Sequence, residues 1–292
     1  MLYKIIHTTS YAYSEPVSLC YNIARLIPRS FEKQVCKKSI VTITPLPDVK
    51  EEYEDFFGNK LMYFAIQQEH KKLTVTVSSE VEKITREAPE INLYGGVSWQ
   101  NVKELTRQST AAWLDVQQYI PETAFTAVTP EIKAYASESY RPGVPMFDAT
   151  HQLMERIYRD FEFRAGFTTI STPLAEVMKA GKGVCQDFAH LAIACARSVG
   201  LPARYISGYL ETMPPPGKQK LAGADASHAW FAVYIPYMGW IEFDPTNNQM
   251  PGAHHITACW GRDYADIAPL KGVIINSGPH QLSVSVDVKR IA

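Results

Sequence analysis

The sequence predicts an α+β protein in which an N-terminal antiparallel β-sandwich precedes a larger domain, where a helix that starts at Cys185 packs on an antiparallel sheet. Three observations predict it. Alternating β-branched and aromatic segments fill the chain up to about residue 85, helical periodicities follow, and a strand hairpin comes after them. A chain of 292 residues is long enough for two cores. We place the domains at residues 1–88 and 97–292.

The sandwich is predicted from four strand-like segments. Pro28 and Pro45 follow two of them, and Gly58-Asn59 is a turn signal between strands. The segments cover residues 4–13, 21–27, 39–44 and 73–77. Ala88-Pro89 and Gly95-Gly96 then mark a linker to the second domain.

The second domain begins with helical segments, predicted over residues 101–117, 131–139 and 147–158. A further helix is expected to start at Pro173, with Thr172 as its cap, and to end at Gly181. The next helix begins at Cys185, and Gly200 with Pro202 closes it.

Strands predominate after the Cys185 helix. They are predicted over residues 204–210, 229–235 and 240–243, and the last two form a hairpin through the turn at 236–239. The Pro-rich loop 213–226 is expected to be a mobile rim or lid. A final alternating strand over 282–288 is expected to complete a sheet of the second domain.

The composition excludes several classes of protein. The chain is 46% hydrophobic and 20% charged, with a formal net charge of −1, so it is neither disordered nor a nucleic-acid binder by charge. The most apolar run, near residues 191–201, contains Arg197 and is too short to span a bilayer, so no membrane partner and a cytoplasmic location are expected. Five cysteines without a Cys-x-x-Cys pair indicate neither a disulfide framework nor a zinc ribbon.

Three residues indicate catalysis. Cys185 opens a helix, where the backbone dipole and a neighbouring imidazole favour a thiolate. His228 precedes one hairpin strand and Asp244 ends the other, so antiparallel pairing brings them to the same end of the sheet. These are a nucleophile, a general base and a group that orients the base.

Other candidates have simpler interpretations. His254, His255 and Cys259 offer metal ligands, but no fourth ligand has zinc-like spacing. Asp263 and Asp266 are interpreted as caps or ion-pair partners. His190 lies five positions after Cys185, about 140° around the helix, and is expected to face away from the site.

The local sequences around the three residues resemble the transglutaminase-like superfamily. They are Gly183-Val184-Cys185-Gln186-Asp187-Phe188-Ala189, His228-Ala229-Trp230, and Gly239-Trp240 through Asp244-Pro245-Thr246. The first 85 residues and the segment Gly261-Arg262-Asp263-Tyr264-Ala265-Asp266 resemble bacterial members. The resemblance implies a papain-like core with Cys185 as nucleophile, His228 as base and Asp244 as orienting acid.

The implied reaction is acyl transfer on an amide or peptide bond through a thioester, with no cofactor and a peptide or protein substrate. We favour hydrolysis. Transfer to an amine, as in a protein-glutamine transglutaminase, remains the alternative, because no residue distinguishes the two acceptors. A non-catalytic scaffold and a metal-dependent hydrolase are the competing classes. The second oxyanion donor, the substrate-binding residues and the oligomeric state stay open.

Overall fold

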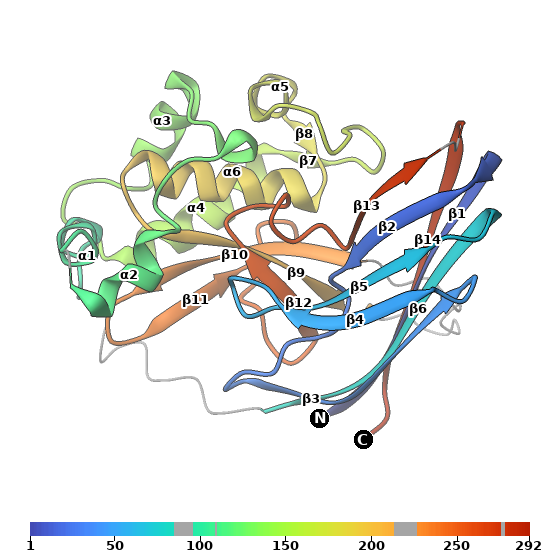
Figure 1. The fold of residues 1–292 in the computed structure, drawn as a ribbon. Coiled ribbons are helices and arrows are strands. Elements are labelled where there is room, and N and C mark those ends of the chain that lie inside the picture. The colour runs from blue at the N-terminus through green and yellow to red at the C-terminus, as the bar shows by residue number, and fades with distance from the viewer. Residues whose placement is uncertain (85–95, 109, 213–226, 276–277) are drawn as a thin grey trace, which may run out of the picture.

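The protein is an α+β molecule made of a β-sandwich and a helix-covered sheet (Figure 1). The computed structural model describes residues 1–292 except 85–95, 109, 213–226 and 276–277. The predicted linker falls mostly, and the predicted lid at 213–226 entirely, outside the described residues. None of the described helices has the length and apolar character needed to cross a membrane.

The sandwich consists of two four-stranded antiparallel sheets, in the orders β14-β1-β6-β3 and β13-β2-β5-β4. Its strands are β1 (Leu2–Val17), β2 (Leu19–Ala24), β3 (Gln34–Thr44), β4 (Val49–Glu54), β5 (Lys60–Ile66), β6 (His70–Lys83), β13 (Leu270–Ile275) and β14 (His280–Arg290). Burial alternates along Tyr3–Thr9 of β1 and Leu73–Val81 of β6, because one face of each strand packs on the buried residues of the two hydrophobic cores.

The last two strands return to the sandwich. β14 pairs with β1 from Tyr3↔Arg290 to Tyr13↔His280, and β13 pairs with β2. The prediction that residues 282–288 complete a sheet of the second domain is therefore wrong. Alternation showed that the segment is a strand, but the partner of a strand depends on contacts that are distant in the sequence.

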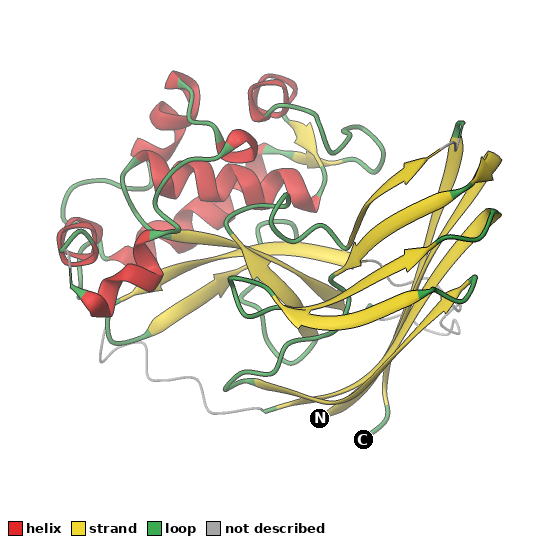
Figure 2. Ribbon diagram, viewed as in Figure 1, coloured by secondary structure: helices red, strands yellow, loops and turns green. Residues whose placement is uncertain are grey.

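The remaining elements form one sheet with helices on one side of it, in the order β11-β10-β9-β12 (Figure 2). The strands are β9 (Ala203–Leu210), β10 (Ser227–Ile235), β11 (Gly239–Phe243) and β12 (His255–Gly261), with a short parallel pair of β7 (Glu162–Phe163) and β8 (Lys182–Gly183). The helices are α1 (Trp99–Thr106), α2 (Ala111–Gln117), the 3₁₀ turn η2 (Ala124–Thr126), α3 (Pro130–Ser137), α4 (Met146–Asp160), α5 (Leu174–Ala180) and α6 (Cys185–Ser198).

Helix α6 is the centre of this region. Residues 187–197 are all buried, since α3, α4, α5 and the sheet surround the helix. Two helix predictions need correction. The segment 101–117 contains two helices, α1 and α2, instead of one. Pro173, not Thr172, is the N-cap of α5, and the Thr172 hydroxyl instead accepts a hydrogen bond from the Thr169 N–H.

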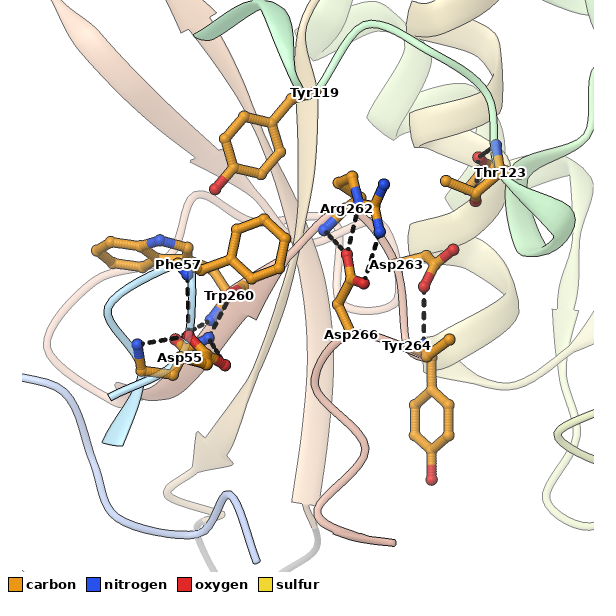
Figure 3. Close-up of polar contacts among 12 residues, drawn as sticks. Asp55, Phe57, Tyr119, Thr123, Trp260, Arg262, Asp263, Tyr264 and Asp266 are labelled. Atoms are coloured by element: carbon orange, nitrogen blue, oxygen red, sulfur yellow. Dashed lines mark hydrogen bonds and ion pairs between the residues drawn. The ribbon is translucent and has the colours of Figure 1, made fainter. Parts of the chain in front are cut away.

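Two side-chain amides join the sandwich to the outer edge of β12. Gln34 donates to the Thr257 carbonyl at 2.8 Å and accepts from the Thr257 N–H at 3.0 Å. Asn59 does the same with Trp260, at 2.8 and 3.0 Å. Asp55 holds Asn59 through its N–H and side-chain amide, and Figure 3 shows Asp55 beside Trp260. The two amides thus occupy backbone groups that a fifth strand would otherwise pair.

Candidate active site

Cys185 is the first residue of α6 and is half-buried. The strand pair β7–β8 fixes the chain just before it. The carboxylate of Asp187 accepts a hydrogen bond from the Val184 N–H at 2.8 Å and another from the Thr168 hydroxyl at 2.5 Å. A Cβ at Gly183 would lie 2.9 Å from that carboxylate, so glycine is required at this position. The helix therefore starts at a defined residue, and Cys185 belongs to the first turn, whose N–H groups have no partner within the helix.

His228 and Asp244 lie together as the hairpin register predicts. His228 is the second residue of β10, and Asp244 directly follows β11. The Nε2–H of His228 donates to Asp244 Oδ2 at 2.8 Å. Both side chains are buried, with Asp244 0% exposed. The carboxylate therefore fixes both the orientation of the imidazole and the nitrogen that carries the proton.

Asp244 is surrounded by donors. Its Oδ1 accepts from the N–H groups of Thr246, at 3.0 Å, and Asn247, at 3.3 Å. Its Oδ2 accepts from three side chains, namely His228, the Asn247 amide at 2.7 Å and His255 Nε2 at 3.0 Å. Burial alone would raise the pKa of Asp244, but the hydrogen bonds from His228 and His255 hold that pKa well below its ordinary value. The carboxylate is therefore ionised throughout the neutral range.

His228 connects this carboxylate to Cys185. Burial lowers the pKa of His228, but its hydrogen bonds with Asp244 and with the side chain of Cys185 outweigh burial and raise the pKa to about 10. The favoured form is an imidazolium between a carboxylate and a sulfur atom. Because Nε2 faces Asp244, Nδ1 is the nitrogen left for the thiol. The three residues predicted to act together are thus brought together.

The residues considered as metal ligands lie in different surroundings. His254 pairs with Glu211 at 2.8 Å, and the buried thiol of Cys259 faces the carbonyls of Arg25 and Ile267. His255 is hydrogen-bonded to Asp244, so the suggested ligands His254, His255 and Cys259 do not point to a common centre.

Three further assignments are settled by contacts. Asp266 forms an ion pair with Arg262 at 2.8 Å, and Asp263 accepts from the Ala265 N–H (Figure 3). Both are structural, as predicted. His190 stacks on Tyr205, with ring centroids 4.7 Å apart, and its Nε2 accepts from the Tyr264 N–H at 3.1 Å. It forms no hydrogen bond with Asp244 or His228 among the described residues, but it does border the hollow at the start of α6, so the expectation that it faces away from the site holds only for the three catalytic candidates.

The cluster of His228, Asp244 and His255 offers one ligand atom from each residue, all within 4.8 Å of one another. Its short separations are hydrogen-bond lengths, and the shared Oδ2 also accepts from Asn247. A metal ion at this oxygen would displace both imidazole protons and one amide donor. The arrangement fits a hydrogen-bonded carboxylate better than a metal centre.

Two contacts in the site were missed by the sequence analysis. Asn247 could have been found from the Asp244-Pro245-Thr246-Asn247 segment, which is typical of a side chain that caps its own turn. His255 had no such signal. It reaches Asp244 from β12, which pairs with β9 and not with β10 or β11, and no local pattern shows that strand order.

The comparisons with known proteins agree with this geometry. Residues 133–245 match the transglutaminase-like superfamily, and residues 3–82 match the bacterial transglutaminase-like N-terminal region. An uncharacterised protein of Mycobacterium bovis is 39% identical over 291 residues, which cover 98% of this chain and 92% of the relative. A protein-glutamine gamma-glutamyltransferase of Pseudomonas aeruginosa is 33% identical over 70 residues, covering 24% of this chain and 10% of that protein.

A solved structure shows the same fold over the whole chain. It is that of a candidate cysteine protease from Cytophaga hutchinsonii, with a TM-score of 0.78 at 20% identity, covering 99% of this chain and 90% of that one. Fold, motifs and the mycobacterial relative lead to one conclusion: the chain belongs to the transglutaminase-like superfamily and carries its bacterial N-terminal region.

Proposed function

We propose that the protein is a cysteine-dependent hydrolase of amide or peptide bonds. One observation carries the proposal. The imidazole of His228 links the side chain of Cys185 to the buried carboxylate of Asp244. A thiol at a helix start, an imidazole with a fixed tautomer and an ionised carboxylate are the groups that thiol acyl transfer requires.

In the proposed reaction, the sulfur of Cys185 attacks the amide carbon and forms a tetrahedral oxyanion. The imidazolium of His228 gives its Nδ1 proton to the leaving amine, the C–N bond breaks, and a thioester remains. Neutral His228 then takes a proton from water, which attacks the thioester. The acid leaves, and the thiolate–imidazolium pair is restored. Asp244 keeps its charge throughout and stabilises the imidazolium.

The N–H groups at the start of α6 support oxyanion stabilisation. The Cys185 N–H has no acceptor within the helix and lies at the positive end of the helix dipole. It is the first proposed oxyanion donor.

A hollow of about 190 Å³ adjoins this helix start and is a candidate position for a substrate side chain. Gln186 and Asp187 border it, together with apolar walls from Phe125 and Leu174. A larger hollow of about 410 Å³ runs along the exposed face of α4. Neither hollow is lined by the three proposed catalytic residues, but Gln186 and Asp187 of the smaller one directly follow Cys185 in α6, which favours it as the substrate position.

Transfer of the acyl group to an amine is the second candidate. It is supported by the local match to the protein-glutamine gamma-glutamyltransferase of Pseudomonas aeruginosa. In this case a lysine-like amine would replace water in the second step. The same three residues would serve both reactions.

The test starts with the rate at which iodoacetamide alkylates Cys185 as a function of pH, measured in the parent and in His228→Ala. We expect fast alkylation that persists well below the ordinary thiol pKa of about 8.5 and is lost in the variant. An ordinary thiol titration in both proteins would contradict the proposal and favour a scaffold. Cys36→Ala removes a half-buried thiol from the sandwich and is the matched control.

A second assay distinguishes water from an amine as the acceptor of the acyl group. A peptide mixture is incubated with the protein and a fluorescent primary amine, and the products are identified by mass spectrometry. New peptide ends that require Cys185 would support hydrolysis. Amine-labelled peptides that form faster than cleaved ones would assign the transferase reaction.

A further inference from the structure

His255 contributes the second imidazole on the carboxylate of Asp244. Its Nε2 lies 3.0 Å from Oδ2, and the residue is 3% exposed. An ionised carboxylate only accepts hydrogen bonds, so His255 Nε2 must carry a proton. Asp244 therefore receives protonated nitrogens from two histidines that belong to different strands, β10 and β12.

The two oxygens of Asp244 have different partners. Oδ1 is held by the backbone N–H groups of Thr246 and Asn247, within the turn that follows β11. Oδ2 receives the side chains of His228, His255 and Asn247. Rotation of the carboxylate would break both sets of bonds. His255 thus opposes a rotation that would take Oδ2 away from His228.

The strand that carries His255 is held on both edges. Its inner edge pairs with β9, where Gly208 lies opposite both His228 and Thr257. A Cβ at Gly208 would lie 2.2 Å from the Ile256 carbonyl oxygen and 2.6 Å from the Trp230 ring, so only glycine allows this close approach. On the outer edge, the Gln34 amide holds Thr257, two residues beyond His255.

The imidazole of His255 also packs edge-on against Trp230, with ring centroids 5.2 Å apart. Trp230 is 0% exposed, and its indole N–H donates to Glu242 at 2.8 Å. The ring therefore rests on a side chain that is itself fixed. A buried polar side chain with one directed hydrogen bond and a fixed ring plane is well suited to orient its partner.

We propose that His255 is a positioning residue that acts through Asp244, extending the proposed Cys185–His228–Asp244 arrangement to a fourth side chain. The inference rests on the proposed function in one respect, that Cys185 and His228 perform the chemistry. His255 touches no reacting atom. It holds the carboxylate oxygen on which His228 depends.

The test compares two substitutions. His255→Phe keeps a flat ring against Trp230 but removes the donor, whereas His255→Gln keeps an N–H donor. We expect His255→Phe to lower both kcat and the alkylation rate of Cys185 about tenfold, the effect of losing one charge-assisted hydrogen bond, with KM unchanged. His255→Gln should stay within about threefold of the parent. The matched control is His254→Phe, which changes the neighbouring, half-exposed histidine that pairs with Glu211.

A measurement on the parent protein tests the inference even if His255→Phe does not fold. Nitrogen NMR of the labelled imidazoles reports which ring nitrogen carries the proton. A protonated Nε2 on His255 is expected, and an unprotonated Nε2 at neutral pH would overturn the inference. In folded His255→Phe, the Nε2–H resonance of His228 should move, because its acceptor is no longer held.

The outcomes separate the two proposals. If the parent cleaves no amide but its thiol reactivity and the His228 resonance depend on His255, the proposed function fails and the positioning role stands. If the parent cleaves amides and His255→Phe leaves kcat, alkylation and the His228 resonance unchanged, the positioning role is wrong.

Discussion

Two cysteine–histidine contacts occur among the residues that the structure describes, one in each region. In the helix-covered region Cys185 meets His228, and in the sandwich the sulfur of Cys20 lies 3.9 Å from His70 Nε2. In both pairs one ring nitrogen faces sulfur and the other is held by an oxygen. At His228 that oxygen belongs to a carboxylate, and at His70 it is the Gln68 carbonyl, 2.8 Å from Nδ1.

The surroundings differ in charge and access. Cys20 lies within β2 and is 0% exposed, and burial raises the pKa of its thiol despite hydrogen bonds that lower it. Cys185 is half-buried at a helix start. The contacts described for the ring nitrogens of His70 are the Cys20 sulfur and the Gln68 carbonyl, whereas the hydrogen bonds of His228 with Asp244 and Cys185 outweigh burial and raise the pKa of His228 to about 10. The comparison indicates that two features determine the reactivity of a cysteine–histidine pair. One is the charge of the oxygen that holds the second imidazole nitrogen, and the other is whether the cysteine lies at a helix start or within a strand.

The largest change in activity is expected when His228 is given a neutral partner, which makes the Cys185–His228 pair resemble the Cys20–His70 pair. Asp244→Asn replaces the carboxylate with a neutral acceptor, as at His70, and the imidazolium loses its counter-charge. We expect amide cleavage to fall about 10⁴-fold, because a neutral side chain neither stabilises the cation nor selects the right tautomer. Initial rates at saturating substrate measure the change.

The control for this change is Asp266→Asn, which removes a carboxylate that pairs with Arg262 on the surface. Activity should remain within about twofold of the parent. A similar loss in both variants would mean that Asp244 acts through stability and not through His228.

The pH dependence of stability sharpens the comparison. The folded-state pKa of His228 is raised from its ordinary 6.5 to about 10, so its stabilising contribution is complete below pH 6.5. It is lost as the pH rises through about 10, since the folded protein then gives up the same proton as the unfolded chain. The change is on the order of 5 kcal/mol.

Urea unfolding of the parent and of His228→Phe, at several pH values between 6 and 10, measures this contribution. The free energy of unfolding of the parent should fall relative to that of the variant as the pH rises. Parallel curves across this range would show that His228 carries no extra proton in the folded protein.

The smallest effect is expected in the sandwich. His70→Phe removes the imidazole beside Cys20 and the hydrogen bond to the Gln68 carbonyl. We expect unchanged amide cleavage and a loss of about 1 kcal/mol in the free energy of unfolding. Thermal unfolding and the cleavage assay together measure it. Reduced cleavage at unchanged stability would show that this pair takes part in function.

Local sequence was enough to predict much of the proposed site. The Gly183 and Cys185 positions follow from helix-start signals, and the proximity of His228 to Asp244 follows from the register of one hairpin. The contacts that were missed cross the sheet. His255 and the partner of β14 depend on strand order, which is set by packing between segments far apart in the chain.

The predicted N-cap of α5 was wrong for a different reason. Thr172 has the sequence of a cap, but its hydroxyl bonds to Thr169 and Pro173 takes the capping position. The turn before the helix competes for the same hydroxyl, and a propensity for one role cannot decide between two local partners.

The amide contacts of Gln34 and Asn59 determine whether the outer edge of β12 is open to a further strand. Without them β12 would present the N–H and C=O groups of Thr257 and Trp260 at an open sheet edge, where a strand from another copy could add. A fragment that lacked residues 1–84 would carry that exposed template, and β13 and β14 would also have lost β2 and β1. The sandwich therefore covers the open edge of the sheet that holds the proposed catalytic residues.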